Sequence, residues 1–397
     1  MRPLRLNLFT AGDCADIHTW SSLPYYFYNA LLAHHVEVNA VDFSPSAGII
    51  YDVISRLASV QARVRHSLFR SRPDDDFHTR RYRVLANRKI EAATQRWHNV
   101  DVNVFLTFSL TSRKWSNVPV VHYCDRTYEQ YLEEVGRAPT RGDRRFMEID
   151  RLNIEQADLV LATCPLCCDF IRTRYHAKRV VYLKGGINAD VPALDVDTLA
   201  AEKESSRDIL FVGRGAYRRG ADILIRAFKI FNTRHQESFT LHMVGVKPDE
   251  LPPDVLTSCG QVRFYSYLDR TKAAERAVYE RLMRRARLFV VPMRPGPLPN
   301  VIQEAHYYCT PVIISNVSNA SDYVRHGYNG IVANGLEPET FASNMDWLVD
   351  DHEQWRQMAV GAHASVADHS WSNTIRNFLE ILRTNGIVKH SFENSIH

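Results

Sequence analysis

Short apolar runs alternate with stretches of helical spacing along most of the chain. The runs typical of buried strands in the first half are residues 4–9, 37–43, 102–108, 118–123, 157–163 and 180–183. Those in the second half are residues 209–212, 241–244, 262–265, 288–291 and 311–314. Apolar residues at helical spacing lie between or after them, for example in 145–156, 275–285, 338–366 and 374–382. This alternation of strands and helices predicts an α/β fold built on parallel sheets.

The segment from residue 288 to 315 carries the clearest sign of a ligand site. Its first apolar run ends in a loop with several prolines and Gly296, and a helix is expected to begin near Pro299 or Asn300. The start of a helix offers free N–H groups to an anion, and Glu304, about one turn in, can accept hydrogen bonds from a sugar diol. Because ligands bind at the carboxyl ends of parallel strands, we expect a binding site here.

Composition places the chain among soluble globular proteins. Its 397 residues are enough for two domains, and 45% hydrophobic and 24% charged residues are ordinary values. A net charge of +4 is too small to indicate nucleic-acid binding, and no apolar run is long enough to span a membrane. The N-terminal stretch is too short and interrupted for a signal peptide. Seven scattered cysteines indicate reduced thiols and a cytoplasmic protein.

A basic amphipathic helix is expected over residues 52–72. Its apolar positions share one face, and Arg56, Arg63 and Arg70 follow one another at seven-residue intervals along its side. Such a helix can lie on an anionic membrane surface, which predicts peripheral contact at the inner face of the membrane. A helix that packs on the core with a solvated arginine flank has the same pattern, so both interpretations remain open.

Polar side chains follow two strands of the first half. The loop after the first strand holds Asp16, His18, Trp20 and Ser21, which suit recognition of sugar hydroxyl groups; a capped helix start is the alternative. His122 and Asp125 follow the strand at 118–123, and we place them near a reaction centre. A histidine beside a strand is often structural, so that alternative also remains open.

The cysteines at 164, 167 and 168 form one C-x-x-C without a partner pair at zinc spacing. They are interpreted as residues at the start of a helix, and no metal site is predicted.

The segment Leu298-Pro-Asn-Val-Ile-Gln-Glu-Ala305 resembles the donor site of retaining glycosyltransferases of family 4, which have the GT-B fold. That family usually carries two glutamates with seven residues between them. Glu304 matches the second, which the resemblance implies binds the ribose of a nucleotide. The first would fall at position 296, where this chain has glycine, so the sugar-contacting role of that glutamate has no counterpart here.

Two further segments resemble the same family. Ile209 to Asp222 contains the family's strand, Gly-Arg and basic-Gly pattern, which implies that Arg214 and Arg219 hold the diphosphate and offset charge on the leaving group. Asp322 to Gly330 resembles the segment that closes the donor pocket. The donor-binding residues expected are Gly213, Arg214, Arg219, Gly245, Pro299, Asn300, Val301 and Glu304.

The resemblance implies two Rossmann-like, doubly wound domains that face each other across a cleft. We expect an acceptor-side domain over residues 1–195, a linker over 196–207, a donor domain over 208–372, and a C-terminal helix and tail over 373–397 that pack back on the first domain. Asp16, His18, Trp20 and Ser21 would line the acceptor side.

The implied function is retaining transfer of a sugar from a nucleotide-diphosphate sugar to a glycan or lipid-linked glycan, without a cofactor or bound metal. The expected catalytic residues are His122, Asp125, Arg214 and Arg219. Two alternatives remain: a degenerate partner subunit of a glycan-assembly complex, as Gly296 would suit, and a nucleotide-sugar epimerase of similar fold.

Overall fold

The chain forms two compact units. The computed structural model describes residues 2–45, 80–190, 192–256, 261–296, 298–317 and 320–388. One unit comprises Met1–Leu132, Ala138–Gly186 and Trp371–His397, and the other comprises Glu133–Arg137 and Ile187–Ser370. The expected basic helix over 52–72, with Arg56, Arg63 and Arg70, lies outside the described residues.

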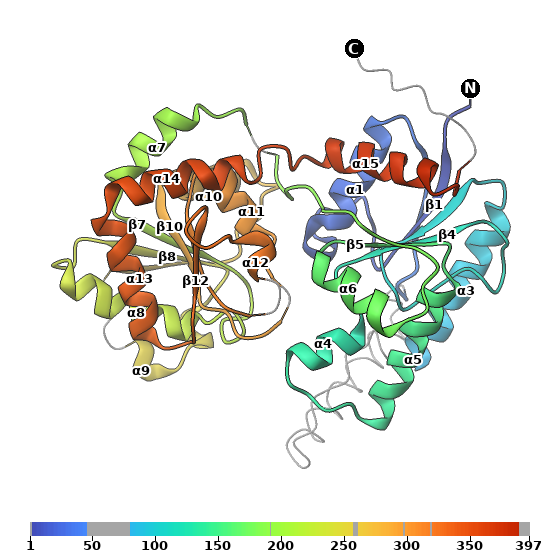
Figure 1. The fold of residues 1–397 in the computed structure, drawn as a ribbon, viewed down its shortest axis with the longest axis horizontal. Coiled ribbons are helices and arrows are strands. Elements are labelled where there is room, and N and C mark those ends of the chain that lie inside the picture. Colours follow the sequence, from blue (N-terminus) through green and yellow to red (C-terminus); the bar gives the residue numbers. More distant parts are fainter. Residues whose placement is uncertain are drawn as a thin grey trace. The chain divides into compact units, whose positions relative to one another are not determined.

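The first unit is built on a parallel sheet of order β2-β1-β3-β4-β5-β6 (Figure 1). Its strands are β1 (Arg5–Thr10), β2 (Glu37–Asp42), β3 (Val102–Phe105), β4 (Val120–Cys124), β5 (Leu159–Ala162) and β6 (Val180–Tyr182). Its helices are η1 (Thr19–Ser22), α1 (Leu23–Ala33), α3 (Arg80–Arg96), α4 (Tyr128–Glu134), α5 (Arg141–Gln156), α6 (Pro165–Arg174) and α15 (Trp371–Thr384). All six strands overlap the apolar runs of the sequence, because strands buried within a parallel sheet are largely apolar.

Both faces of this sheet are buried. On one face Leu6 and Leu8 of β1 pack in a cluster with α1 and α15. On the other face the rings of Phe9 and Phe105 stack with centroids 4.3 Å apart and lie in a cluster with residues of α3. The sheet is therefore the middle layer of the unit.

Three asparagines form a ladder across β2, β1 and β3. Asn7 of β1 lies in register with Asn39 of β2 and Asn103 of β3. The amide of Asn7 donates to Asn103 Oδ1 at 2.8 Å, and the amide of Asn39 donates to Asn7 Oδ1 at 2.9 Å. Paired amides of this kind satisfy buried polar groups and disfavour any other strand register.

The C-terminal helix α15 packs against α1. Phe378 meets Phe27 edge to face at 5.5 Å, and Trp371 meets the same ring at 6.0 Å. Gly186 lies so close to the start of this helix that a Cβ there would come within 2.6 Å of the Trp371 nitrogen. Glycine at position 186 therefore allows α15 to pack against the rest of the first unit.

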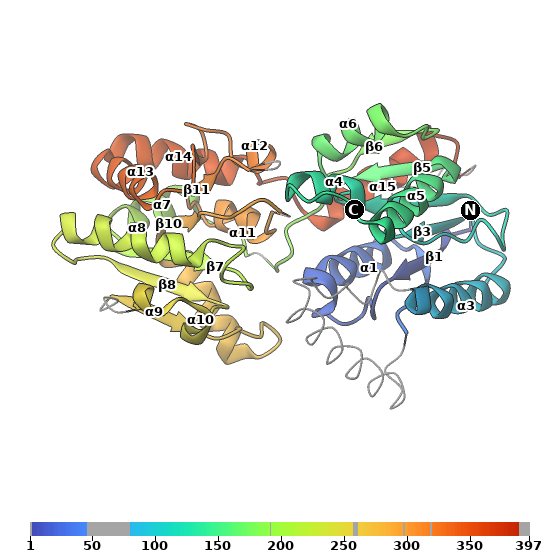
Figure 2. The ribbon, with the colours of Figure 1, turned by 90° about the horizontal axis from the view of Figure 1, so that it is seen from below.

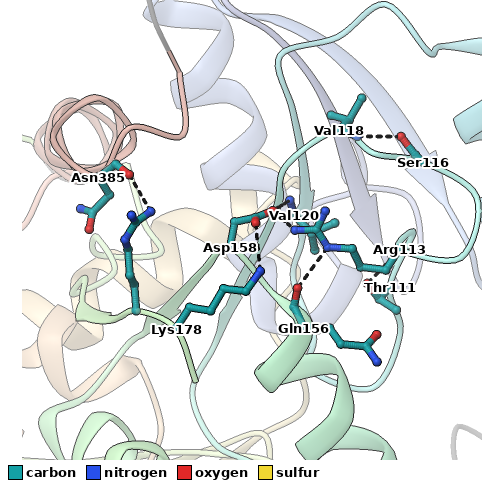
Figure 3. Close-up of polar contacts among 10 residues, drawn as sticks. Thr111, Arg113, Ser116, Val118, Val120, Gln156, Asp158, Lys178 and Asn385 are labelled. Atoms are coloured by element: carbon teal, nitrogen blue, oxygen red, sulfur yellow. Dashed lines mark hydrogen bonds and ion pairs between the residues drawn. The ribbon is translucent and has the colours of Figure 1, made fainter. Parts of the chain in front are cut away.

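Asp158 joins several connections at the amino end of β5 (Figure 3). Its Oδ2 accepts the Val120 N–H at 2.8 Å and pairs with Arg113, while its Oδ1 lies 3.5 Å from Lys178 Nζ. Arg113 also donates from Nε to Gln156 O at 3.1 Å. One carboxylate thus fixes the starts of neighbouring strands.

The second unit has a parallel sheet of order β12-β11-β10-β7-β8-β9. Its strands are β7 (Asp208–Val212), β8 (Thr240–Val244), β9 (Val262–Tyr265), β10 (Ala286–Val291), β11 (Val312–Ser315) and β12 (Gly330–Ala333). Its helices are α7 (Val196–Glu204), α8 (Ala221–Arg234), η3 (Pro248–Glu250), α9 (Pro253–Leu256), α10 (Ala273–Arg285), α11 (Val301–Tyr307), α12 (Ala320–Tyr323), α13 (Pro338–Asp350) and α14 (His352–Ala364). The doubly wound α/β fold class is confirmed.

The helices of the second unit form a layer on each side of its sheet. Helix α13 packs on α8, and α8 on α9, whereas α7 contacts both α14 and α10. Figure 1 shows these two layers with the sheet between them, and in Figure 2 the strands β11, β10, β7 and β8 follow one another across the same sheet. The expected helical pattern over 338–366 is two helices, because Asp351 ends α13 and caps α14 by accepting the Gln354 N–H at 2.9 Å.

The range 196–207, expected as a linker, holds helix α7 instead. Asp195 caps this helix by accepting the Thr198 N–H at 3.2 Å. Its Leu199, Ala200 and Lys203 are buried in the second unit. The polar composition that indicated a linker belongs to the exposed face of a short amphipathic helix.

Lys203 is the polar anchor of α7. It is 1% exposed, and its Nζ donates to Met283 O at 2.9 Å, to Thr310 Oγ1 at 2.6 Å and to Tyr308 O. Burial lowers the pKa of this amine from 10.5 to about 7. The lysine therefore joins three elements through carbonyl and hydroxyl acceptors.

We expect Lys203→Met to remove a pH-dependent part of the stability. Between pH 7 and 10.5 the unfolded chain binds more protons at Lys203 than the folded chain, so the wild-type free energy of unfolding rises with pH. The rise is at most about 1.4 kcal/mol per pH unit, and the variant should lack it. Urea unfolding across this range measures the difference, and parallel profiles for the two proteins would contradict it.

Candidate functional site

The site forms where the strand order of the second unit reverses. Strands β7 and β10 are neighbours in the sheet, although α8, β8, η3, α9, β9 and α10 lie between them in the chain. The loops that follow them, residues 213–220 and 292–300, both begin at the carboxyl edge of the sheet. From there the chain continues to opposite faces of the sheet. In doubly wound sheets ligands bind at this switch point.

Two glycines allow the loops after β7 and β8 to approach closely. Gly213 N–H donates to Val244 O at 3.0 Å. Gly245 has a φ of +82°, and a Cβ there would lie 3.1 Å from Gly213 O. A Cβ on Gly213 would itself lie 3.2 Å from Arg219 Cγ. Small residues at both positions leave the backbone open to a ligand.

Arg214 and Arg219 lie on this loop in different environments. Arg214 is exposed, and its guanidinium lies over the ring of Tyr267, 5.4 Å from the ring centroid. Arg219 is half-buried, with Nη1 3.8 Å from Met293 Sδ on the neighbouring loop. The loop therefore presents one exposed and one packed positive charge at the switch point. Tyr267, which follows β9, was not identified from the sequence as part of the site.

The loops after β7 and β10 touch through their backbones. Gly220 has a φ of +71°, and a Cβ there would lie 1.8 Å from Pro292 O, which no packing can accommodate. The Arg294 N–H donates to Arg218 O at 2.9 Å. These contacts join the two loops into one surface.

Arg294 is a functional neighbour that sequence reasoning missed. Its two Nη atoms donate to Asp222 at 2.9 and 2.8 Å, and its guanidinium lies 3.8 Å from the ring centroid of Tyr217. The hydrogen bonds with Asp222 raise the pKa of Arg294. This bidentate pair fixes the start of α8 to the loop after β10.

Glu304 is held in place on one side only. It is 4% exposed, and its Oε2 accepts Tyr279 Oη at 2.7 Å and Arg270 Nη1 at 3.1 Å. Burial beside this carboxylate raises the pKa of Tyr279 well above its usual range. Within the described part of the chain no residue donates to Oε1, so that oxygen can accept a hydrogen bond from a ligand.

The residues before Glu304 form the first turn of α11. Ile302 N–H donates to Pro299 O at 3.2 Å and Gln303 N–H to Asn300 O at 2.9 Å. Asn300 occupies the N-cap position without a side-chain capping bond, and Val301 is buried behind it. The expected donor residues Pro299, Asn300 and Val301 thus lie at the start of a helix beside the loop after β7.

Gly296 has a backbone conformation that other residues rarely adopt. Its φ is +147°, and a Cβ there would lie 3.6 Å from Arg218 Cδ. There is room for a side chain, but the backbone would be strained. A glutamate at this position would therefore require a different loop conformation.

His122 lies in the core of the first unit. It is fully buried, its Nδ1 donates to Thr107 O at 2.6 Å, and its ring lies between Phe105 and Phe108. Burial lowers the pKa of His122 to about 4, so the imidazole is neutral at physiological pH. These contacts agree with the alternative that His122 is a structural residue, because its ring has no surface that a substrate could contact.

Asp125 is more accessible than His122. Its side chain is 39% exposed and lies 3.4 Å from Arg126 Nε. The two residues are close in sequence, but the strand ends between them, at Cys124. Of these two residues, only Asp125 can therefore contact a ligand from solution.

The loop after β1 has an unusual backbone. Asp16 Oδ1 accepts the His18 N–H at 2.9 Å, and Trp20 is 41% exposed. Trp20, Ser21 and Ser22 have positive φ values of 37°, 55° and 65°. Ser22 precedes α1 without a side-chain capping bond, so the cap that was considered at Ser22 does not form. Such positions cost of order 1–3 kcal/mol each and concentrate at functional sites.

The cysteines at 164–168 begin a helix as expected. Cys164 is the N-cap of α6, and its Sγ accepts the Cys167 N–H at 3.4 Å. Among the residues that the structure describes, no group of three or more His, Cys, Asp or Glu could hold a metal ion. Within the same ranges no helix is long and apolar enough to cross a membrane.

A family model described as Glycosyl transferases group 1 matches residues 199–363, which include all the expected donor residues. One relative, the D-inositol 3-phosphate glycosyltransferase of Thermobispora bispora, is 25% identical over 291 residues. That alignment covers 68% of this chain and 66% of the relative, so the chain spans about two thirds of the length of that protein.

Solved structures resemble the whole chain. Sucrose-phosphate synthase from Thermosynechococcus elongatus gives a TM-score of 0.68 at 17% identity, over 96% of this chain and 98% of that one. Anabaena Alr3699/HepE in complex with UDP-glucose gives 0.61 at 16% identity, over 96% and 100%. At these identities the likeness concerns the fold, and it confirms the expected GT-B class.

We expect Gly220→Ala to destabilise the second unit more than Gly215→Ala. Both glycines have similar positive φ values, +71° and +79°, but a Cβ on Gly220 meets Pro292 O whereas one on Gly215 has nothing within 4 Å. The backbone strain of about 1 kcal/mol is common to both, and Gly220→Ala adds the cost of separating two loops, on the order of 1–3 kcal/mol. Chemical denaturation of the two variants measures the difference; equal losses would contradict the tight contact.

Proposed function

We propose that the chain, whose residues 199–363 match the family model of glycosyl transferases group 1, belongs to that family and transfers a sugar from a nucleotide-diphosphate donor to a glycan or lipid-linked glycan acceptor. The observation that carries this proposal is the switch point of the second unit. There a glycine-lined loop with Arg214 and Arg219 lies beside a helix start and a buried carboxylate with one oxygen available.

In this proposal the diphosphate binds the loop after β7. Arg219 and Arg214 supply positive charge, and the close backbone approach at Gly213 and Gly245 leaves space for phosphate oxygens. The nucleotide ribose binds Glu304 through Oε1, while Tyr279 and Arg270 hold Oε2. A UDP-sugar is the first donor to test, because a protein of similar fold was solved with UDP-glucose.

The proposed reaction retains the anomeric configuration. The bond from C1 to the diphosphate oxygen breaks as the acceptor oxygen approaches the same face of the sugar. The acceptor proton passes to the departing phosphate oxygen. Fixed charge from Arg214 and Arg219 stabilises the negative charge that grows on the diphosphate, and preorganised charge of this kind is usually the largest catalytic contribution.

A front-face reaction needs no carboxylate nucleophile. That suits a chain with glycine at 296, where the backbone does not readily accept a glutamate. His122 has no surface available for substrate, so the proposal assigns it no catalytic step. Asp125, which is partly exposed, remains the first-unit residue proposed to act near the transferred sugar.

The acceptor is proposed to bind the first unit at the loop after β1. Asp16, His18, Trp20 and Ser21 supply polar groups and an exposed aromatic ring, a combination suited to sugar rings. An acceptor screen should include D-inositol 3-phosphate, because a relative carries that name, beside soluble oligosaccharides and lipid-linked glycans. A lipid-linked acceptor would place the enzyme at the inner face of the membrane.

We expect Arg214→Ala to lower the rate of sugar transfer by about 10²–10³, because it removes charge that stabilises the leaving diphosphate. Arg214 is exposed, so the variant should fold normally. Arg226→Ala is the matched control, since Arg226 lies on α8 and pairs with Asp254. Transfer of a radiolabelled sugar from a UDP-sugar gives the rates. A rate near that of the wild type in Arg214→Ala would contradict the role of Arg214 in stabilising the leaving diphosphate.

Glu304→Gln should weaken UDP binding by roughly tenfold, because a charge-assisted hydrogen bond to the ribose becomes a neutral one. Tyr279→Phe should have a smaller effect, since Arg270 still holds Oε2. Calorimetric titration of UDP into both variants and wild type makes the comparison. Unchanged affinity in Glu304→Gln would argue against the ribose contact.

Retention of the anomeric configuration can be tested separately. NMR of the product formed from an α-linked UDP-sugar should give an α-glycoside. A β-glycoside would establish inversion and rule out the front-face mechanism, whatever the donor and acceptor.

A further inference from the structure

A second polar pocket lies in the second unit, away from the switch point. It has a volume of about 420 Å³ and is enclosed by Arg207, Arg263, Arg281 and Arg285 around Asp208 and His242. We call it the arginine pocket. Its walls are the amino ends of β7 and β8, strand β9 and the last turns of α10. At this size it can enclose a small organic molecule rather than a bare ion.

The arginines of the pocket lie at the opposite end of the strands from the candidate donor loop, although Tyr265 ends β9 in register with Val244. Asp208 is the first residue of β7 and Val212 the last, and the loop with Arg214 follows Val212. Those strand ends are roughly 13 Å apart at 3.3 Å per residue. The pocket is thus a different site from the one proposed for the nucleotide sugar.

Positive charge dominates this pocket. Four arginines face one carboxylate, Asp208, which is already engaged by Arg285 Nε at 2.8 Å and His242 Nε2 at 3.1 Å. Burial acts to raise the pKa of Asp208, but the hydrogen bonds from His242 and Arg285 outweigh it and hold the pKa below its usual range. The carboxylate is therefore ionised and already engaged.

Two of the guanidinium groups have no partner among the residues that the structure describes. Arg207 donates to Ser238 Oγ at 3.1 Å and lies 4.9 Å from the ring centroid of Phe239. The side chains of Arg263 and Arg281, by contrast, make no hydrogen bond or ion pair with any part of the chain that the structure describes. Each offers a planar fork of N–H donors, the geometry that matches phosphate oxygens.

The floor of the pocket is rigid and partly aromatic. The rings of His242 and Tyr265 are stacked at 5.8 Å, and His242 Nδ1 lies 3.1 Å from Tyr265 Oη. Because Nε2–H donates to Asp208, Nδ1 accepts from the tyrosine hydroxyl. This chain of hydrogen bonds holds two flat rings beneath the arginines, as a surface for the non-ionic part of a ligand.

We propose that the arginine pocket binds a small molecule that carries phosphate with at least two negative charges. Arg263 and Arg281 bind its phosphate oxygens, Arg207 and Arg285 add positive charge, and the body of the ligand lies on the rings of Tyr265 and His242. This inference does not depend on the proposed transferase activity.

The probe for the test is inorganic pyrophosphate, titrated calorimetrically into four proteins. They are the wild type, Arg263→Gln/Arg281→Gln, Arg276→Gln as a control on the outer face of α10, and Arg214→Gln/Arg219→Gln to remove charge from the other site. Arg263 and Arg281 are exposed, so their replacement should not unfold the chain. Hydrogen exchange with and without pyrophosphate then locates the binding.

We expect the affinity of the arginine pocket for pyrophosphate to fall at least tenfold in Arg263→Gln/Arg281→Gln and to be unchanged in Arg276→Gln and Arg214→Gln/Arg219→Gln. Pyrophosphate should slow exchange at residues 262–265 and 281–285. Unchanged binding in Arg263→Gln/Arg281→Gln, or slowed exchange confined to residues 213–220, would overturn the proposal.

A lipid headgroup offers the same chemistry from another source. A flotation assay distinguishes a soluble ligand from a lipid headgroup. It uses vesicles that contain 30% phosphatidic acid, with and without pyrophosphate. If pyrophosphate displaces the vesicles and its affinity falls in Arg263→Gln/Arg281→Gln, the results support a soluble ligand. Vesicle binding that needs Arg263 and Arg281 but resists pyrophosphate would overturn it in favour of the headgroup.

Discussion

The approach of two loops at the centre of the second sheet is the constraint on which the candidate site depends. Pro292 O occupies the space that a side chain at 220 would need, so the chain after β7 can turn into α8 only with glycine there. The bond from Arg294 N–H to Arg218 O and the pair with Asp222 then fix the register of the loops. The position of the loop that carries Arg214 and Arg219 therefore follows from a backbone contact.

Much of the fold could be predicted because the sheets are buried on both faces. Such strands are continuous apolar runs, and those runs identified almost every strand. Strand β12 was missed because it is short, begins with Gly330 and follows a loop of polar residues. The helix α7 was missed for a related reason: only a few of its positions are buried, so its composition resembled a linker.

The site was predictable where a short segment carries the chemistry and unpredictable where distant segments meet. The glycines and arginines after β7 and the start of α11 could be identified from sequence neighbours alone. The contacts of Glu304 with Tyr279 and Arg270 depend on the way α10 and the loop after β9 pack, which no local pattern reports. His122 shows the opposite error, because a polar residue at a strand end can still point into the core.

Lys203 gives the structure a chemical reporter of its own opening. In the folded protein its amine is enclosed and held by three acceptors, so no reagent can reach it. Acylating reagents can modify it only when α7 separates from the strands beneath it. The rate of its modification would therefore measure how often the first helix of the second unit detaches from the folded protein, much as exchange of a protected amide measures local unfolding.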